Sequence, residues 1–204
     1  MYQIRYMQLR RALNPILGST TKLELLRTLF RSPGREWTGR ELARSAGVSA
    51  AQAARDLAEL ADTSVVLRDV VGRSYSWRLN SSHVLFASLT GLFAQEASLR
   101  AELLHDLSDE LRLARPERVR LFGSISRGEE RPDSDVDLFV QVRTPAERNE
   151  IEEAVQRIRT RVWDRFGNPV SALVYTRAEL VRPRNPALLE SIEREGVEVE
   201  TGAR

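Results

Sequence analysis

Hydrophobic residues near the start of the chain recur at helical spacing. Between residues 20 and 30 they are three and four positions apart, which places them on one face of a helix. The residues of this face are Leu23, Leu26 and Phe30, with Leu25 and Leu29 alongside. Ser32, Pro33 and Gly34 interrupt the pattern, so we expect the first helix to end there.

Two further helix starts follow this break. Thr38 precedes Glu41 by three positions, and Ser49 precedes Gln52 in the same way. Each pair has the form of a capping box, in which side chains satisfy the free amides of a helix's first turn. Gly47 lies between the two starts and can adopt the positive φ that closes a helix before a tight turn. This order of signals predicts a helix-turn-helix.

The period then changes from helical to alternating. An apolar run at 65–67 leads to a turn at Gly72 and Arg73, after which apolar and polar residues alternate up to Leu79. This pattern predicts a β-hairpin. Three helices followed by a hairpin resemble the winged helix-turn-helix DNA-binding domains of prokaryotic regulators.

The resemblance covers about residues 18–80, and we assign the first domain to residues 1–80. It implies that the helix beginning after Ser49 lies in the major groove of double-stranded DNA. Gln52 and Arg55 would then reach bases or phosphates, and Arg73 at the hairpin turn would contact the backbone.

The distribution of charge favours DNA as the partner of this domain. Residues 1–80 carry 13 basic and 7 acidic residues, a balance of +6, whereas the rest of the chain carries 18 and 22, a balance of −4. Basic side chains displace the counterions of phosphates. However, Arg55 is the single basic residue among the alanines of the third helix. A protein-interaction or dimerisation module therefore stays open as the alternative.

A stripe of leucine and phenylalanine follows at helical spacing in residues 81–114. It predicts one or two helices that connect the domains, with Gly91 as the break. Such a stripe is typical of a core or of a helix–helix seam, so a homodimer formed through it is an alternative to core packing. The stripe consists of Leu85, Leu89, Leu92, Phe93, Leu99, Leu103, Leu107 and Leu111.

Composition excludes several classes of protein and site. The sequence has no cysteine, which rules out a disulfide framework, a thiolate nucleophile and a cysteine zinc site. No stretch approaches the roughly 20 apolar residues of a membrane-spanning helix, and the first residues lack a signal-peptide pattern. We therefore expect a cytoplasmic protein without a membrane partner.

The segment VRLFGSISRGEERPDSDVDLFVQV, residues 119–142, contains the candidate chemistry. One apolar strand ends at an abrupt turn, Gly123-Ser124, and a second begins at Asp135-Val-Asp137. Because strand side chains alternate, the two aspartates point to the same face. Their repulsion would be relieved by a divalent cation, and Mg²⁺ with phosphate oxygens fits this description.

The turn before the carboxylates has the composition of a phosphate site. A glycine lets the backbone approach a phosphate closely, and the hydroxyl and amides beside it can donate to phosphate oxygens. Together with the two aspartates, the turn predicts a site for a nucleoside triphosphate such as ATP, with Mg²⁺ as the cofactor.

Ten residues separate Ser124 from Asp135, and this Gly-Ser, ten residues, Asp-x-Asp spacing is the motif of the DNA polymerase β nucleotidyltransferase superfamily. LFGSISRG and SDVDLFV resemble the minimal nucleotidyltransferases, including antitoxins beside HEPN-domain partners and members with an N-terminal helix-turn-helix. The resemblance spans about residues 115–200, and we assign the second domain to residues 115–204. It implies an α+β protein of two domains, the second with a mixed sheet and flanking helices.

The resemblance also implies a reaction, the transfer of a nucleoside monophosphate from a triphosphate to an acceptor hydroxyl. The residues that it assigns are Asp135 and Asp137 for catalysis and magnesium, Gly123 and Ser124 for the phosphates, and Arg127 for the triphosphate. For Arg127, an ion pair with Glu129 or Glu130 is the alternative.

One feature of the superfamily is missing. Active members usually carry a third carboxylate on the next strand, which here reads Asn168-Pro-Val-Ser-Ala-Leu-Val-Tyr175, with Ser171 at the expected position. Two functions therefore stay open. The first is a magnesium-dependent nucleotidyltransferase that the winged helix targets or regulates. The second is a DNA-binding transcription regulator or antitoxin whose degenerate nucleotidyltransferase fold senses nucleotide or binds a partner, such as a HEPN-type toxin.

Overall fold

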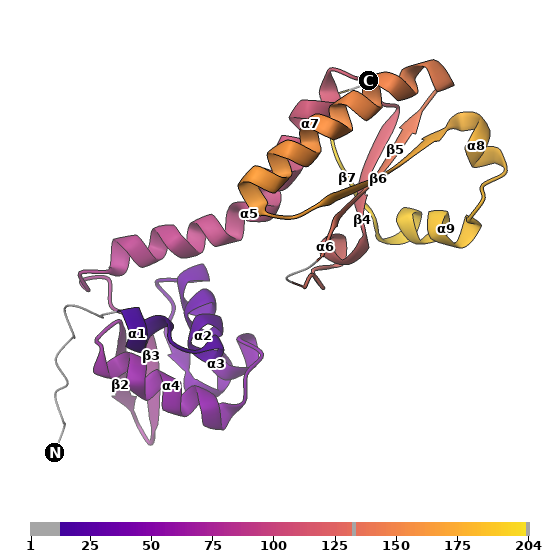
Figure 1. Ribbon diagram of the computed structural model, residues 1–204. Helices are drawn as coiled ribbons and strands as arrows, with labels where there is room; N and C mark the ends of the chain where they lie inside the picture. Colours follow the sequence, from indigo (N-terminus) through magenta and orange to yellow (C-terminus); the bar gives the residue numbers. More distant parts are fainter. Residues whose placement is uncertain (1–12, 132–133, 203–204) are drawn as a thin grey trace. The chain divides into compact units, whose positions relative to one another are not determined.

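The computed structural model describes residues 13–131 and 134–202, and the chain divides into two compact units at Ser98 and Leu99 (Figure 1). We call residues 1–98 unit 1 and residues 99–204 unit 2. Helices are mixed with two separate β-sheets, which confirms the α+β class. Across the described residues, every helix is too short or too polar to cross a membrane.

Unit 1 packs helices against a small antiparallel sheet (Figure 1). The sheet has the strand order β1-β3-β2, and its β2–β3 hairpin turns at Gly72 and Arg73, as predicted. The elements are α1 (Leu13–Leu17), α2 (Thr20–Arg31), β1 (Trp37–Thr38), α3 (Gly39–Ser45), α4 (Ala50–Asp62), β2 (Val66–Val71) and β3 (Ser74–Leu79).

The predicted helix starts of unit 1 are present, but one capping box is incomplete. At α3, the Glu41 amide donates to Thr38 Oγ1 and the Glu41 carboxylate accepts from the Thr38 amide, so both halves of the box form. At α4, Ser49 Oγ accepts from the Gln52 amide at 3.2 Å. The Gln52 side chain donates instead to Asp56 one turn further on, at 2.9 Å. The prediction of a reciprocal box at Ser49 was therefore wrong.

Helix α5 (Phe86–Arg112) runs without interruption, so the predicted break at Gly91 was wrong. A glycine inside a helix costs only about 1 kcal/mol relative to alanine. Leu89 and Phe93, one turn apart around it, are buried in the core of unit 1 and hold the helix together there. Further along, Leu103, Leu107 and Leu111 enter the core of unit 2, so one leucine stripe supplies both cores.

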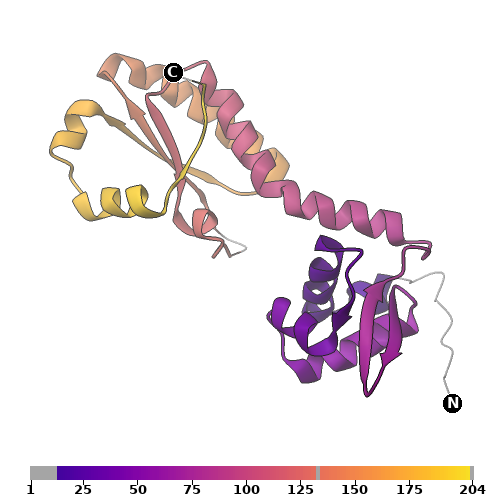
Figure 2. The same ribbon diagram turned by 180° about the vertical axis from the view of Figure 1, so that it is seen from behind.

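Unit 2 is built on a mixed four-stranded sheet in the order β6-β5-β4-β7 (Figures 1 and 2). β5 is antiparallel to β4 and parallel to β6, and β7 pairs antiparallel with β4. Its elements are β4 (Arg118–Phe122), α6 (Gly123–Arg127), β5 (Val136–Val142), the 3₁₀ turn η1 (Pro145–Glu147), α7 (Arg148–Phe166), β6 (Val170–Thr176), α8 (Arg177–Val181), α9 (Pro186–Glu195) and β7 (Val197–Glu198).

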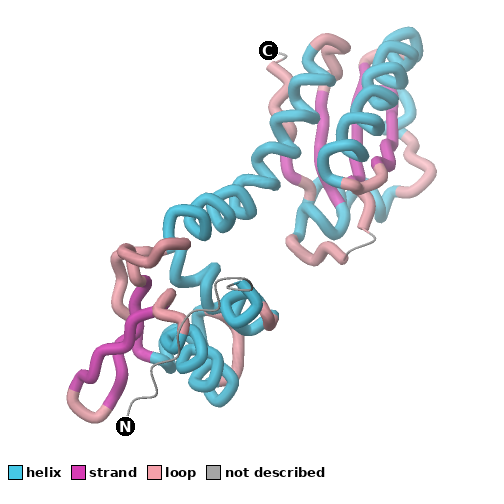
Figure 3. The backbone as a smooth tube through the Cα atoms, turned by 60° about the vertical axis from the view of Figure 1, so that its left-hand side comes forward, coloured by secondary structure: helices cyan, strands magenta, loops and turns pink. Residues whose placement is uncertain are grey.

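The two faces of this sheet have different coverings. Val119 and Leu121 of β4 and Leu138 and Val140 of β5 are fully buried in one core with α7 and the second half of α5, which lie side by side over that face (Figures 1 and 3). Strand alternation directs Asp137 to the opposite face. The alternation of side chains along β5 thus places the apolar core on one face of the sheet and Asp137 on the other.

A ladder of ion pairs joins the two helices that cover the core face. Acids one turn apart on α5 meet arginines one turn apart on α7, and the central carboxylate, Asp106, has only 2% of its side chain exposed. The members of the ladder are Glu102, Asp106 and Glu110 with Arg157, Arg161 and Arg165.

Candidate functional site

Gly123 and Asp137 meet where β4 ends and β5 begins. Phe122, the last residue of β4, pairs in register with Asp137. Gly123 follows with φ +78°, and a Cβ added to it would lie 2.2 Å from Asp137 Oδ2. Any other residue would therefore be strained at this φ and would collide with the carboxylate. The glycine allows the backbone of the turn to touch the carboxylate directly.

Asp135 and Asp137 form an uncompensated pair of negative charges. Burial, and secondly the neighbouring Asp135 carboxylate, raise the pKa of Asp137 above its ordinary value. In the described part of the chain, neither aspartate has an ion pair with arginine or lysine. A bound cation would supply the missing positive charge.

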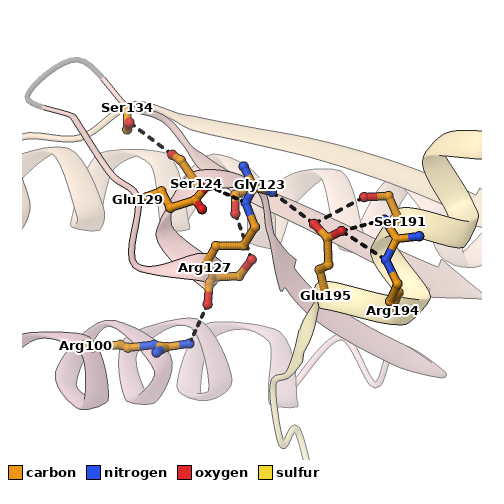
Figure 4. Close-up of polar contacts among 10 residues, drawn as sticks. Arg100, Gly123, Ser124, Arg127, Glu129, Ser134, Ser191, Arg194 and Glu195 are labelled. Carbon is orange, nitrogen blue, oxygen red and sulfur yellow. Dashed lines mark hydrogen bonds and ion pairs between the residues drawn. The ribbon is translucent and has the colours of Figure 1, made fainter.

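Ser134 connects the turn to the neighbouring strand, and sequence analysis did not select it. Ser124 Oγ donates to Ser134 Oγ at 3.0 Å (Figure 4), and the Arg131 amide donates to the same oxygen at 2.8 Å. Asn168 Nδ2 donates to the Ser134 carbonyl at 2.9 Å. In the sequence, Ser134 is marked only by its position next to Asp135, and Asn168 only as a polar residue just before β6. Pro132 and Asp133 of this loop lie outside the described residues.

Arg127, at the end of α6, is engaged with two acids. Its Nε donates to Glu129 at 2.8 Å, which is the pairing weighed as the alternative, and its Nη1 donates to Glu195 of α9 at 3.2 Å (Figure 4). Glu195 also accepts from Arg194 and Ser191. A triphosphate would have to replace these carboxylates, so the role of Arg127 toward phosphate stays a prediction.

Ser171, where the resemblance leads us to expect a third carboxylate, lies on β6 directly beside Asp137 of β5. Its side chain is exposed. Within residues 13–131 and 134–202, no group of three acidic or histidine residues could hold a metal ion. Mg²⁺ commonly takes only one or two protein carboxylates and completes its shell with water and substrate phosphates. Two aspartates without a basic partner in the described ranges are therefore enough to hold Mg²⁺ if the phosphates of a nucleotide complete its coordination shell.

The predicted DNA-binding residues of unit 1 lie at two places. Gln52 and Arg55 are together on α4, where Arg55 donates to the Gln52 side-chain oxygen. Arg73 is exposed at the turn of the β2–β3 hairpin. A further cation on the hairpin, Arg68, was not selected; its guanidinium lies 4.6 Å from the centroid of the Tyr75 ring.

Residues 101–199 match the family model described as a nucleotidyltransferase domain. The matched segment contains the Gly-Ser turn, both aspartates and the four strands of the unit 2 sheet. The second half of the chain thus carries a nucleotidyltransferase-type domain. A comparison with curated proteins gives no match.

Two solved structures are similar to parts of the chain. One, from Methanosarcina mazei Go1, is described as a possible transcriptional regulator; it is 13% identical over 44% of this chain and 78% of its own, with a TM-score of 0.33. The other is described as a toxin-antitoxin with AMP-PNP; it is 17% identical over 48% of this chain and 72% of its own, with a TM-score of 0.35.

Proposed function

We propose that unit 2 is a magnesium-dependent nucleotidyltransferase that moves a nucleoside monophosphate from a triphosphate, such as ATP, to an acceptor hydroxyl. The observation that carries this proposal is the contact of the Gly123 backbone with the Asp137 carboxylate. A turn whose composition suits phosphate lies beside a pair of negative charges for which the described residues supply no arginine or lysine partner. The match of residues 101–199 to the nucleotidyltransferase domain supports the same reading.

Each residue of the site has a defined task in this proposal. Asp135 and Asp137 hold Mg²⁺, which when bound neutralises the triphosphate and the departing pyrophosphate. The backbone amides of the Gly123-Ser124 turn donate to the β- and γ-phosphate oxygens. The Ser124 hydroxyl, which donates to Ser134 Oγ in the structure, would turn to a phosphate oxygen when nucleotide binds. Ser134 and Asn168 orient the turn through the hydrogen bonds that connect it to β6.

The acceptor oxygen forms a bond to the α-phosphorus while the bond from that phosphorus to the bridging oxygen breaks, and pyrophosphate leaves. The hydroxyl proton passes to solvent, because Ser171 beside Asp137 is not a base at neutral pH. We therefore expect slow turnover, since a positioned general base usually contributes about 10²–10⁴-fold.

The test is incubation of the full chain with α-labelled nucleoside triphosphates, Mg²⁺ and candidate protein, RNA and small-molecule acceptors. The proposal expects transfer of label that is lost in Asp135→Asn, Asp137→Asn and in EDTA. If no acceptor is labelled, but the wild type binds triphosphate with Mg²⁺ and the variant does not, the domain senses nucleotide. That result would favour the regulator or antitoxin with a HEPN-type partner. Absence of both transfer and binding rejects the site.

We infer a second role for unit 1, the binding of double-stranded DNA by a winged helix. The supporting observations are α3 and α4 joined through Gly47 at φ +67°, the hairpin that follows them, and the exposed Arg73 at its turn. DNA binding would target or autoregulate the nucleotidyltransferase.

Mobility shift with fragments of the gene's own promoter tests this role. We expect binding that Arg55→Ala, Arg73→Ala removes, whereas Arg182→Ala, Arg184→Ala, with the same loss of charge in unit 2, retains it. Failure of the wild type to bind any DNA at low salt would leave unit 1 as a protein-interaction module.

A further inference from the structure

A cavity of about 800 Å³ opens at the other end of the unit 2 sheet from the Gly-Ser turn. Its walls include the residues that precede β4 and those that follow β5 and β6. β5 starts at the carboxylates and runs for seven residues toward the cavity, which separates the two ends by about 20 Å at 3.3 Å per residue. The cavity is therefore distinct from the proposed nucleotide site.

Among the described residues, four arginines and one acid line this cavity: Arg112, Arg115, Arg143, Arg177 and Glu117. Glu117 is already engaged, because it accepts from Arg177 Nε at 2.7 Å and from Gln141 Nε2 at 3.0 Å. The Arg177 guanidinium correspondingly lowers the pKa of Glu117. Glu117 thus offsets Arg177, and Glu147 offsets Arg143 at 3.1 Å. Arg112 and Arg115 remain as the excess positive charge of the described lining.

Arg112 and Arg115 differ from most arginines of unit 2. Arg118 and Arg120, for example, both donate to Glu193. In the described ranges, by contrast, Arg112 and Arg115 have neither an ion pair nor a hydrogen bond from the side chain. Two positive charges without ion-pair partners that face a common cavity repel one another, so an anion bound there would be stabilising.

The backbone at this place is also unusual. Arg115 has φ +46°, in the left-handed region, where a residue with a Cβ is strained and glycine is not. Glycine at this position would avoid the strain but would remove the guanidinium from the cavity wall. Backbone strain of this kind persists where the surrounding structure maintains it, often at ligand sites.

We propose that this arginine cavity binds the phosphate groups of a multiply charged ligand, with Arg112 and Arg115 as its principal contacts. The planar guanidinium matches phosphate oxygens with two parallel hydrogen bonds, and arginines on several walls suit a ligand with more than one phosphate. A free polyphosphate and the phosphodiester backbone of a nucleic acid acceptor both have this chemistry.

The experiment measures binding to the full chain at low salt without divalent cations, by calorimetry for inorganic triphosphate and by fluorescence anisotropy for a short single-stranded RNA. The variant is Arg112→Gln, Arg115→Gln. The matched control is Arg182→Gln, Arg184→Gln, which removes the same charge from exposed residues between α8 and α9 outside the cavity. We expect at least about tenfold weaker binding in the variant only, because it loses the charge-assisted hydrogen bonds to phosphate.

The two arms identify the source of the phosphate: an effect confined to triphosphate indicates a small ligand, and one confined to RNA indicates a nucleic acid strand. If binding of a probe changes in the Asp135→Asn, Asp137→Asn variant and not in the cavity variant, that probe occupies the nucleotide site and the proposal is overturned for it. The proposal is overturned if the wild type binds neither probe, or if the cavity variant and the control lose affinity equally.

Discussion

Asp106 and Asp137 are both carboxylates of unit 2, but their surroundings are opposite. Asp106 is almost fully buried between α5 and α7, where Arg161 and Arg165 pair with it. Asp137 is partly exposed, has another aspartate as its nearest charge, and touches the Gly123 backbone. The first carboxylate is satisfied within the protein, as a structural residue must be. The second has no arginine or lysine partner among the described residues, and Mg²⁺ is the partner that we propose for it.

The arginine partners of Asp106 give the largest expected effect on stability. Arg161→Met, Arg165→Met keeps the apolar stems but leaves a buried carboxylate without its ion pairs, which we expect to cost about 3–5 kcal/mol in the free energy of unfolding. Denaturant titration followed by hydrogen exchange of α5 and α7 measures this loss. Adding Asp106→Asn should recover much of it.

Arg148→Met is the control on the same helix, because its pair with Glu179 is exposed and screened by solvent. Equal losses in this control and in the double variant would show that Asp106 is not a special carboxylate, and the comparison with Asp137 would fail.

Gly123→Ala tests the contact on which the nucleotide site rests. The added methyl group displaces the Asp137 carboxylate, and a misplacement of about 1 Å costs roughly 10²-fold in rate. We therefore expect labelled transfer to fall at least about 100-fold. Gly167→Ala is the matched control: Gly167 also has a positive φ, +75°, but a Cβ there meets nothing within 4 Å. If the two variants lose the same activity, backbone strain and not the collision is responsible.

Ser171→Asp would bring a third acid beside Asp137. The new carboxylate could accept the hydroxyl proton, so we expect roughly a tenfold gain in transfer with Mg²⁺, at the low end of what a general base contributes. Ser171→Asn has a similar size without the charge and should leave the rate unchanged. A gain in both variants, or in neither, would contradict the proposal that position 171 is where the general base is missing.

The smallest expected effect is the pH dependence that Asp137 causes without divalent cations. Because its pKa is raised in the folded state, folding favours the protonated form. Stability should therefore fall as the pH rises from the ordinary carboxyl range through the raised pKa. Above this window Asp137→Asn should be more stable than the wild type by less than about 1 kcal/mol, since solvent screens the pair.

Thermal unfolding of the two proteins measures this difference in stability, and hydrogen exchange of β5 shows whether it arises at the site. Added Mg²⁺ should raise the melting temperature of the wild type and not that of the variant, which reverses their order. Asp109→Asn, an exposed acid on α5, is the control and should show neither change. A wild type that is insensitive to Mg²⁺ at every pH would count against the metal site.

Local signals predicted the elements and the turn of the site. Alternation around Asp137 predicted the direction of its side chain. The resemblance to the superfamily indicated Ser171 as the position of the third carboxylate, and in the structure Ser171 pairs with Asp137. The helix break predicted at Gly91 was wrong, because the burial of Leu89 and Phe93 on either side of it outweighs the low helix propensity of glycine.

Pairs distant in sequence were not accessible to the same reasoning. Arg127 and Glu195 are 68 positions apart, and Asp106 and Arg165 are 59 positions apart. In each case the local pattern of alternating charge resembles an ordinary solvated helix. Only the packing of α9 beside α6, and of α5 beside α7, determines which acid meets which arginine.

The continuity of α5 determines how the chain responds to proteases. Proteases need a segment that can adopt an extended conformation in their active sites, which is why they usually cut loops. The boundary between Ser98 and Leu99 lies inside a hydrogen-bonded helix of 27 residues. A cut there requires local unwinding of the helix, which is anchored in unit 1 by Leu89 and Phe93 and in unit 2 by Leu103, Leu107 and Leu111. The two units should therefore resist separation by limited digestion, even though Leu99 itself is 44% exposed.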